Sequence, residues 1–157
     1  MAFLTADELK DAIYEYQVDQ ITDGDDNIVV NAISAATDEV RSYLTGNRKK
    51  EWDDGRLRYD VDAIFDAAGV ERNALILAHT KTIAKWWIIL LANPDIIYEQ
   101  VKERYDRSVA YLKMVAKGDV TIGSLPVITP PAPNPDTDDP NDGGIAIWGS
   151  RPKFNHE

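Results

Sequence analysis

Hydrophobic positions recur with helical spacing along the first two thirds of this chain. Between an acidic turn at 23–27 and Thr45-Gly46, apolar side chains return every three or four residues, which is the stripe of an amphipathic helix: Val29, Ile33, Ala36, Val40 and Tyr43. Before it, Thr5 and Glu8 form a capping box that predicts a first helix over about 6–14, with Phe3 or Leu4 as its hydrophobic staple. The pattern favours helices over strands.

The apolar pattern changes over 73–93, where hydrophobic side chains cover most of the helix circumference. This predicts the central helix of the fold, with Trp87 and Leu90 at the centre of the bundle. Asn93-Pro94-Asp95 then supplies a cap, a proline at the first helical position and an acid, which predicts a further helix ending at Lys117-Gly118. Its inward residues are expected to be Ile97, Val101, Tyr105, Val109, Leu112 and Val115.

Together these elements predict an all-α fold, a small bundle of about four helices over 1–118 whose last two helices form a long hairpin with its corner at Asn93-Pro94. Between Asn47 and Arg72 the periodicity weakens, and we interpret 47–72 as a loop excursion. Within it, residues 57–61 read as a short extended piece, followed by one or two helical turns before Gly69.

Residues 119–157 read as an extended arm outside the bundle. The Pro/Asp-rich tract 130–144 is too polar to bury a core and predicts a tether. Apolar residues return beyond it, which predicts a docking arm that adds a β-strand to a partner or anchors side chains on it, with two basic residues pairing to acidic groups. The predicted contact residues are Ile145, Ile147, Trp148, Arg151, Lys153 and Phe154. Folding of the arm onto its own core is the alternative.

The net charge of the chain limits the classes of partner that it can bind. The net charge is −10, which disfavours wrapping of nucleic acid and docking on an anionic bilayer, and is compatible with DNA that passes without binding. The chain contains no cysteine, so disulfides and thiolate metal sites are excluded. We expect no leader peptide and no membrane span, because the apolar run 86–92 is far shorter than a bilayer requires.

The residues that could carry chemistry are few. Two histidines, His79 and His156, are too differently placed to read as a pair, and no nucleophile, zinc or phosphate-loop motif occurs. Asp23, Asp25 and Asn27 match the first positions of a calcium loop, but Ile28 and Ser34 stand where glycine and glutamate are required. A simple turn with Asn27 as helix cap is therefore favoured. We predict no catalytic, cofactor or metal site, and no enzyme.

Two other clusters read as structural. The Trp86-Trp87 pair is interpreted as part of the core rather than a stacking platform, because the helix around it is apolar on all sides. The basic run 48–50 is followed at once by acidic residues and is interpreted as a solvated loop.

Several short segments together resemble the head–tail adaptor (connector) proteins of tailed bacteriophages, in particular the Mu-like prophage virion group. They are Phe3-Leu4-Thr5 with Leu9, Ile21-Thr22-Asp23, the second-helix residues Ala32, Ala36, Glu39, Val40, Tyr43 and Leu44, then Tyr105, Tyr111-Leu112, Ala116-Lys117-Gly118 and the terminal 150–154. Two departures are the length of the excursion at 47–72 and the length of the tether, so contacts made by those segments do not carry over.

The resemblance implies a structural protein of the virion neck, made in the host cytoplasm. Such adaptors are helical bundles arranged in a ring, typically twelvefold, beneath the portal protein. The ring joins the capsid to a tail or stopper protein and lines the channel for double-stranded DNA, and the C-terminal arm grips the portal. A protein of another class, a helical binding module that uses its C-terminal peptide to recognise a partner, is the alternative.

Overall fold

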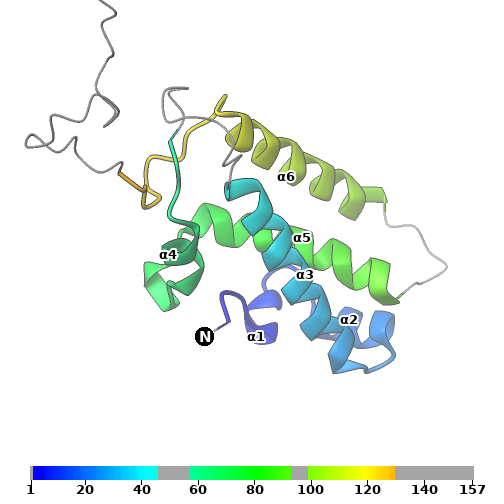
Figure 1. Cartoon of the computed structure of the whole chain (residues 1–157). Coiled ribbons are helices and arrows are strands. Elements are labelled where there is room, and N and C mark those ends of the chain that lie inside the picture. Colours follow the sequence, from blue (N-terminus) through cyan, green and yellow to red (C-terminus); the bar gives the residue numbers. More distant parts are fainter. Residues whose placement is uncertain (1, 46–56, 93–98, 130–157) are drawn as a thin grey trace, which may run out of the picture.

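Three long helices form the centre of the fold, which we describe from a computed structural model of residues 2–45, 57–92 and 99–129 (Figure 1). They are α3 (Asp26–Leu44), α5 (Ala74–Ala92) and α6 (Glu99–Lys117), each of 19 residues. α5 packs against both α3 and α6, and α6 runs back along α5 in the opposite direction (Figure 1). Over the described residues the only β-pairing is one isolated bridge, so the all-α prediction is confirmed.

The amphipathic stripe of α3 is the face that packs on the rest of the bundle. Val29, Ile33, Ala36 and Val40 are buried and Tyr43 is partly buried, as the spacing predicts. The cap differs from the prediction. The side chain of Asp25, not Asn27, accepts the backbone N–H of Asn27 at 2.9 Å, because Asp25 is the last residue with extended backbone before the helix.

The N-terminal segment forms two short helices, α1 (Ala6–Leu9) and α2 (Glu15–Thr22), so the prediction of one helix over 6–14 is wrong. The capping box is present, with Thr5 N–H donating to Glu8 Oε2 at 3.1 Å, and both Phe3 and Leu4 are buried. Leu9 and Ile13 are buried as well. The break follows from Tyr14, whose extended backbone turns the chain so that Val18 and Ile21 of α2 can also reach the core.

The second half of the predicted excursion belongs to the packed fold. After an extended stretch at 57–60, α4 (Val61–Asp66) and a 3-10 turn, η2 (Gly69–Glu71), provide the helical turns expected before Gly69. Tyr59, Ile64 and Phe65 are buried in the core. The turn and basic run expected at 46–56 lie outside the described residues.

α5 is the central helix, as predicted. Asn73 Oδ1 caps it by accepting the N–H groups of Leu75 at 3.0 Å and Ile76 at 3.1 Å. Its central turns are fully covered, with Ile76, Thr80, Ile83, Ala84 and Ile88 at 0% exposure. The placement of Leu90 at the centre is wrong, because the last turn of α5 reaches the end of the bundle and leaves Leu90 47% exposed. Trp87 is partly buried against the core.

α6 ends at Lys117, followed by Gly118 at a φ of 86°, where the sequence predicts the stop. Val109, Leu112 and Val115 are buried, and Val101 and Tyr105 are partly buried. Ile97 and the corner of the hairpin lie outside the described residues. Beyond Gly118 the chain turns back onto the bundle, where Ile122 and Leu125 join the core. This corrects the predicted boundary at 118, because the packed unit includes these residues.

Candidate interaction surfaces

The predicted arm lies outside the described residues. This applies to every member of the contact set: Ile145, Ile147, Trp148, Arg151, Lys153 and Phe154.

The chain leaves the bundle beside α4, through a short antiparallel pairing. Tyr59 and Val127 form the bridge, flanked by backbone hydrogen bonds from Asp60 N–H to Pro126 O at 2.9 Å and from Ile128 N–H to Arg58 O at 2.7 Å. The Tyr59 hydroxyl also accepts the N–H of Ile122 at 2.8 Å. The sequence predicts an extended piece at 57–61 but not its partner, because residues 126–128 belong to the segment 119–157 that the sequence predicts as an arm outside the bundle.

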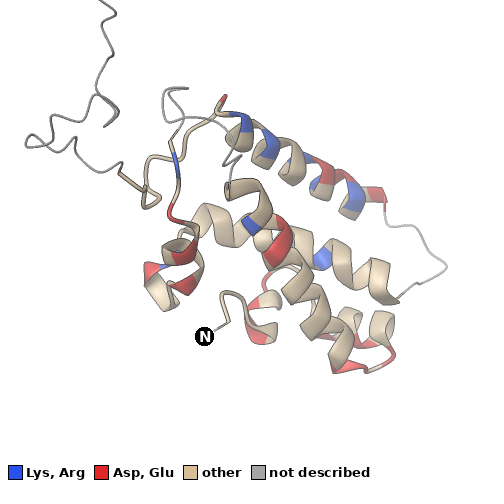
Figure 2. Ribbon diagram, in the orientation of Figure 1, with Lys and Arg blue, Asp and Glu red and all other residues tan. Residues whose placement is uncertain are grey.

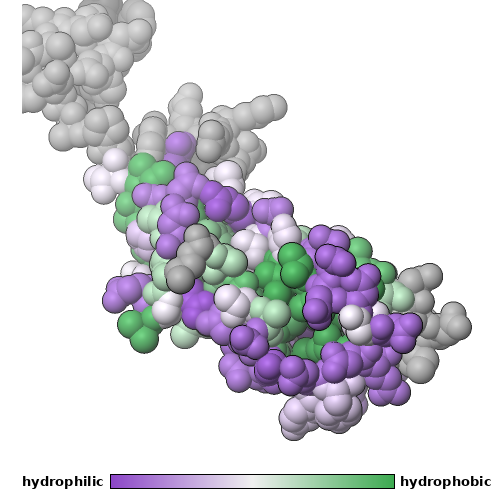
Figure 3. Space-filling view, turned by 90° about the horizontal axis from the view of Figure 1, so that it is seen from below, coloured by the Kyte–Doolittle hydropathy of each residue, from purple (hydrophilic) through white to green (hydrophobic). Residues whose placement is uncertain are grey.

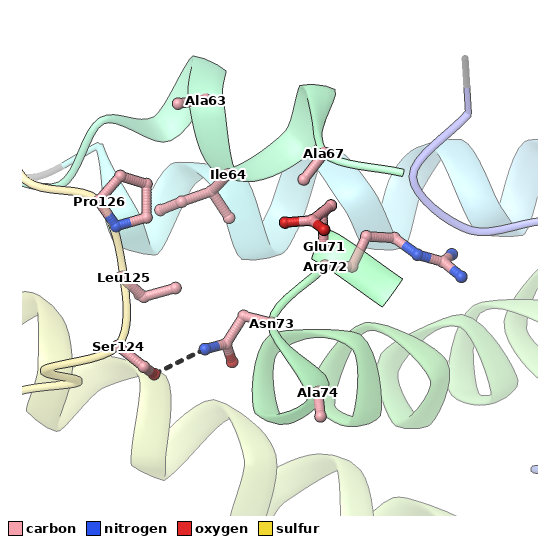
Figure 4. A pocket seen from close by; sticks show the side chains of 10 residues that line it. All are labelled: Ala63, Ile64, Ala67, Glu71, Arg72, Asn73, Ala74, Ser124, Leu125 and Pro126. Carbon is pink, nitrogen blue, oxygen red and sulfur yellow. Dashed lines mark hydrogen bonds between the residues drawn. The ribbon is translucent and has the colours of Figure 1, made fainter. Parts of the chain in front are cut away.

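An open pocket of about 330 Å³ lies next to this exit, between α4, the start of α5 and the returning chain (Figure 4). Asn73 Nδ2 donates to Ser124 Oγ across it at 2.8 Å. The Arg72 side chain extends away from Ser124 and Leu125 (Figure 4), and its guanidinium donates to the Phe3 carbonyl at 2.7 Å and to Glu8 Oε2 at 2.9 Å. Arg72 is therefore committed to the N-terminal segment, and the pocket shows no nucleophile–base pair.

The Glu8–Arg72 ion pair shapes the electrostatics of this region. A hydrogen bond from Arg72 is the main reason that the pKa of Glu8 is lowered from 4.5 to about 2, with the Thr5 cap adding to the shift against partial burial. The pair ties α1 to Arg72, which lies between η2 and the Asn73 cap of α5, so its role is structural.

A second polar centre joins the three long helices. The carboxylate of Glu39 on α3 accepts Trp87 Nε1–H at 2.8 Å with one oxygen and the Tyr105 hydroxyl at 2.9 Å with the other. Burial and the negative charge of Glu39 raise the pKa of Tyr105, which keeps the phenol neutral as a donor. Trp86 stacks on Tyr105 with ring centroids 5.5 Å apart. Both indoles are thus engaged between helices. Trp87 is partly buried against the core, whereas Trp86 is only partly buried and lies outside the core cluster, so the core interpretation does not hold for Trp86.

His79 lies on the flank of α5. Its ring stacks on Tyr111 of α6 at 4.9 Å, and its buried Nε2 is the one buried side-chain polar atom without a partner in the described chain. Burial lowers the pKa of His79, which favours the neutral ring. The ring of His79 therefore packs at the contact between α5 and α6. His156 lies outside the described residues.

The aspartate turn serves the helix ends. Asp23 takes a left-handed conformation with φ of 53° at the end of α2, and Asp25 caps α3. Nowhere in 2–45, 57–92 or 99–129 do three His, Asp or Glu side chains gather as a metal site would require.

Two segments of opposite charge lie on different sides of the molecule, although the first half of α6 also carries the acidic residues Glu99, Glu103 and Asp106 (Figure 2). Residues 14–26, which include α2, carry five acidic and no basic side chains, whereas residues 107–117 of α6 carry three basic and no acidic ones. α6 lies on one side of α5, and α2 lies toward the other side with α1 and the start of α3 (Figures 1 and 2). Seen from below, hydrophilic residues surround a group of hydrophobic ones on the described surface (Figure 3).

Within the part of the chain that the structure describes, one helix, α5, is long and apolar enough to cross a membrane by length and composition, although only the shorter run 86–92 stands out in the sequence. In this fold it packs against α2, α3 and α6. Searches of protein-family models, of curated proteins and of solved structures found no match to this chain.

Proposed function

We propose that this protein is a structural component of a bacteriophage neck, a head–tail adaptor that assembles as a ring beneath the portal. The ring joins the capsid to the tail or stopper protein and lines the channel for double-stranded DNA. The proposal rests on the resemblance of short segments to that family, and it agrees with a small helical bundle of acidic net charge.

The observation that supports it best is the way the chain leaves the bundle. The described core is built from residues between Phe3 and Leu125, and the Tyr59–Val127 pairing then fixes the exit point. From there the tract 130–144 spans up to about 45 Å if it takes a polyproline conformation. That reach is enough for the apolar segment beyond it to meet another subunit.

Attachment to the portal tests the proposal. The portal protein encoded by the same genome is mixed with the full chain, with a chain lacking 130–157, and with the pair Ile147→Asp and Trp148→Ala. Of these three proteins, only the full chain should form ring-shaped assemblies on the portal, because the truncation and the paired substitution each remove the apolar anchors. Asn155→Ala serves as the matched control in the same arm and should bind normally.

The outcomes separate the two functional classes. Heads without tails in a phage that carries the truncated gene would support the adaptor role. A protein that stays monomeric on the portal and binds another partner through 145–154 would instead support a helical binding module. Normal attachment of the truncated chain would contradict the role of the arm.

A further inference from the structure

Two exposed helix faces are complementary in charge and in apolar anchors. On α2, Tyr16, Asp19 and Gln20 follow one another at spacings of three and one, Asp23 comes directly after the helix, and all four are exposed. Tyr16 is 64% exposed and stacks on Tyr14, which is 67% exposed, with ring centroids 5.8 Å apart. Exposed aromatic pairs with a charged surround are typical of protein interfaces.

The second face belongs to α6. Arg107, Ala110, Met114 and Lys117 recur at spacings of three, four and three, with Lys113 beside them, and all are exposed. Met114 is 41% exposed and offers an adaptable apolar contact. Arg107 forms an ion pair with Glu103 on the same helix, and the exposed Asp106 lies beside it. Lys113 and Lys117, which form no ion pair within the described residues, therefore carry the main positive charge of this face.

We propose that the basic face of α6 docks on the Tyr14–Tyr16 face of α2 in a second copy of this chain. Lysine side chains over tyrosine rings and beside Asp19 and Asp23 provide cation–π and charge pairing, and Met114 supplies apolar contact. The charge argument favours another copy as the occupant, because every copy carries both halves of the pairing and a net charge of −10 disfavours nucleic acid.

The geometry of the two faces sets the kind of assembly. α6 and α2 lie on different sides of α5 (Figure 1), so each copy can use α6 toward one neighbour and α2 toward another. Such a contact is heterologous, and repeated head to tail it closes into a ring or continues as a filament. The inference deepens the proposed adaptor ring and rests on it only for closure of the ring.

Disulfide trapping tests this contact. Because the chain has no native cysteine, any disulfide that forms must join the introduced ones. In the full chain, Gln20→Cys and Ala110→Cys place one thiol in each face without removing an anchor. On mild oxidation at low salt the double variant should give a ladder of trimers and higher species, since each copy then has two linkable neighbours. Each single variant alone should give none of these, and the two single variants mixed should stop at dimers.

Two controls define specificity. Val70→Cys combined with Ala110→Cys places a 97% exposed thiol elsewhere and should form no ladder. Lys113→Glu with Lys117→Glu should reduce the ladder about tenfold, as should half-molar salt. Lys102→Glu with Arg104→Glu changes the net charge equally on the same helix and should leave the ladder intact.

Three results would overturn the contact: an equal ladder from the Val70 control, a ladder unaffected by the Lys113 and Lys117 changes, or crosslinking of Ala110→Cys to Thr137→Cys instead of Gln20→Cys. The last result would assign the α6 face to the acidic tether. If the double variant forms the ladder but the full chain does not bind the portal through its arm, the contact between copies is supported and the adaptor role is not. If the full chain forms rings on the portal but the double variant forms no ladder, the adaptor role is supported and the proposed contact is not.

Discussion

Trp87 Nε1 donates a hydrogen bond of 2.8 Å to Glu39 Oε2, across the interface between α5 and α3. The other carboxylate oxygen accepts the hydroxyl of Tyr105 from α6 at 2.9 Å. One side chain thus fixes the relative positions of three helices, whose remaining contacts are largely apolar and would tolerate some sliding. Directional bonds of this kind set the register of a bundle.

The first prediction concerns this carboxylate. Glu39→Ala should lower the free energy of unfolding by about 2–3 kcal/mol, because it leaves two partly buried donors without an acceptor. Glu39→Gln, which keeps one acceptor oxygen, should cost about 1 kcal/mol. Urea unfolding followed by circular dichroism measures both, with Asp38→Ala at the exposed neighbour as control, expected within about 0.5 kcal/mol of wild type. If Glu39→Ala and Asp38→Ala are equally stable, Glu39 does not set the register of the three helices.

The second prediction is a pH dependence that arises from Glu8. Because the folded state lowers the pKa of Glu8 from 4.5 to about 2, its ion pair with Arg72 contributes fully above pH 4.5 and is lost as the pH falls toward 2. We expect a loss of about 1–2 kcal/mol over that range, allowing for solvent screening of a pair that is partly exposed. Glu8→Gln should flatten this part of the stability profile.

Glu15→Gln is the matched control for that profile, since Glu15 pairs with Lys10 at an exposed position. This substitution should leave the loss of stability between pH 4.5 and 2 unchanged. If the same loss of stability persists in Glu8→Gln, other carboxylates cause the pH dependence.

The third prediction compares two neighbouring positions of α5. Ile88 has 0% exposure and Leu90 has 47%. Ile88→Asp should abolish cooperative unfolding because it buries an unpaired charge, whereas Leu90→Asp should retain a cooperative transition within about 1 kcal/mol of wild type. Thermal melts of the two variants test this. If Leu90→Asp loses cooperative unfolding and Ile88→Asp keeps it, the core lies on the other face of α5.

The fourth prediction locates the end of the folded unit. Removal of 130–157 should leave the unfolding midpoint unchanged. Removal of 119–157 should cost about 3–5 kcal/mol, because it exposes the sites of Ile122 and Leu125 and leaves Tyr59 without its partner. If both truncations destabilise equally, the arm contributes to its own core.

The fifth prediction concerns DNA. With −10 charges per copy, the assembled protein should bind duplex DNA weakly or not at all near physiological salt, even beside a DNA channel. Fluorescence anisotropy with a labelled duplex measures this. Salt-sensitive binding below micromolar concentration would rule out an acidic lining.

The long helices were predictable because their hydrophobic spacing and caps agree. The stripe from Val29 to Val40, the apolar run of α5 and the stop at Gly118 each reflect a local rule that the fold obeys. The break after Leu9 was not predictable in this way, since neither glycine nor proline marks it and the burial of Ile13 continues the helical spacing.

The interaction surfaces depended more on tertiary placement. A carboxylate at position 39 has no special pattern, and its two donors lie 48 and 66 residues away in sequence. Ile122 and Leu125 stand three apart in a segment with glycine and proline, where no periodicity indicates burial. The charged faces could be read as helix faces only after α2 and α6 were placed on different sides of α5.

The pairing of residues 58–60 with 126–128 has a mechanical consequence. Tension on the chain beyond residue 130 meets this pairing before it reaches α6. The Asp60–Pro126 and Ile128–Arg58 hydrogen bonds lie across the direction of the two paired segments, so a pull in the direction of residues 126–128 loads both hydrogen bonds together instead of opening them one by one. Force is thereby delivered to the base of α4, and the last helix of the bundle is shielded from being unwound from its C-terminal end.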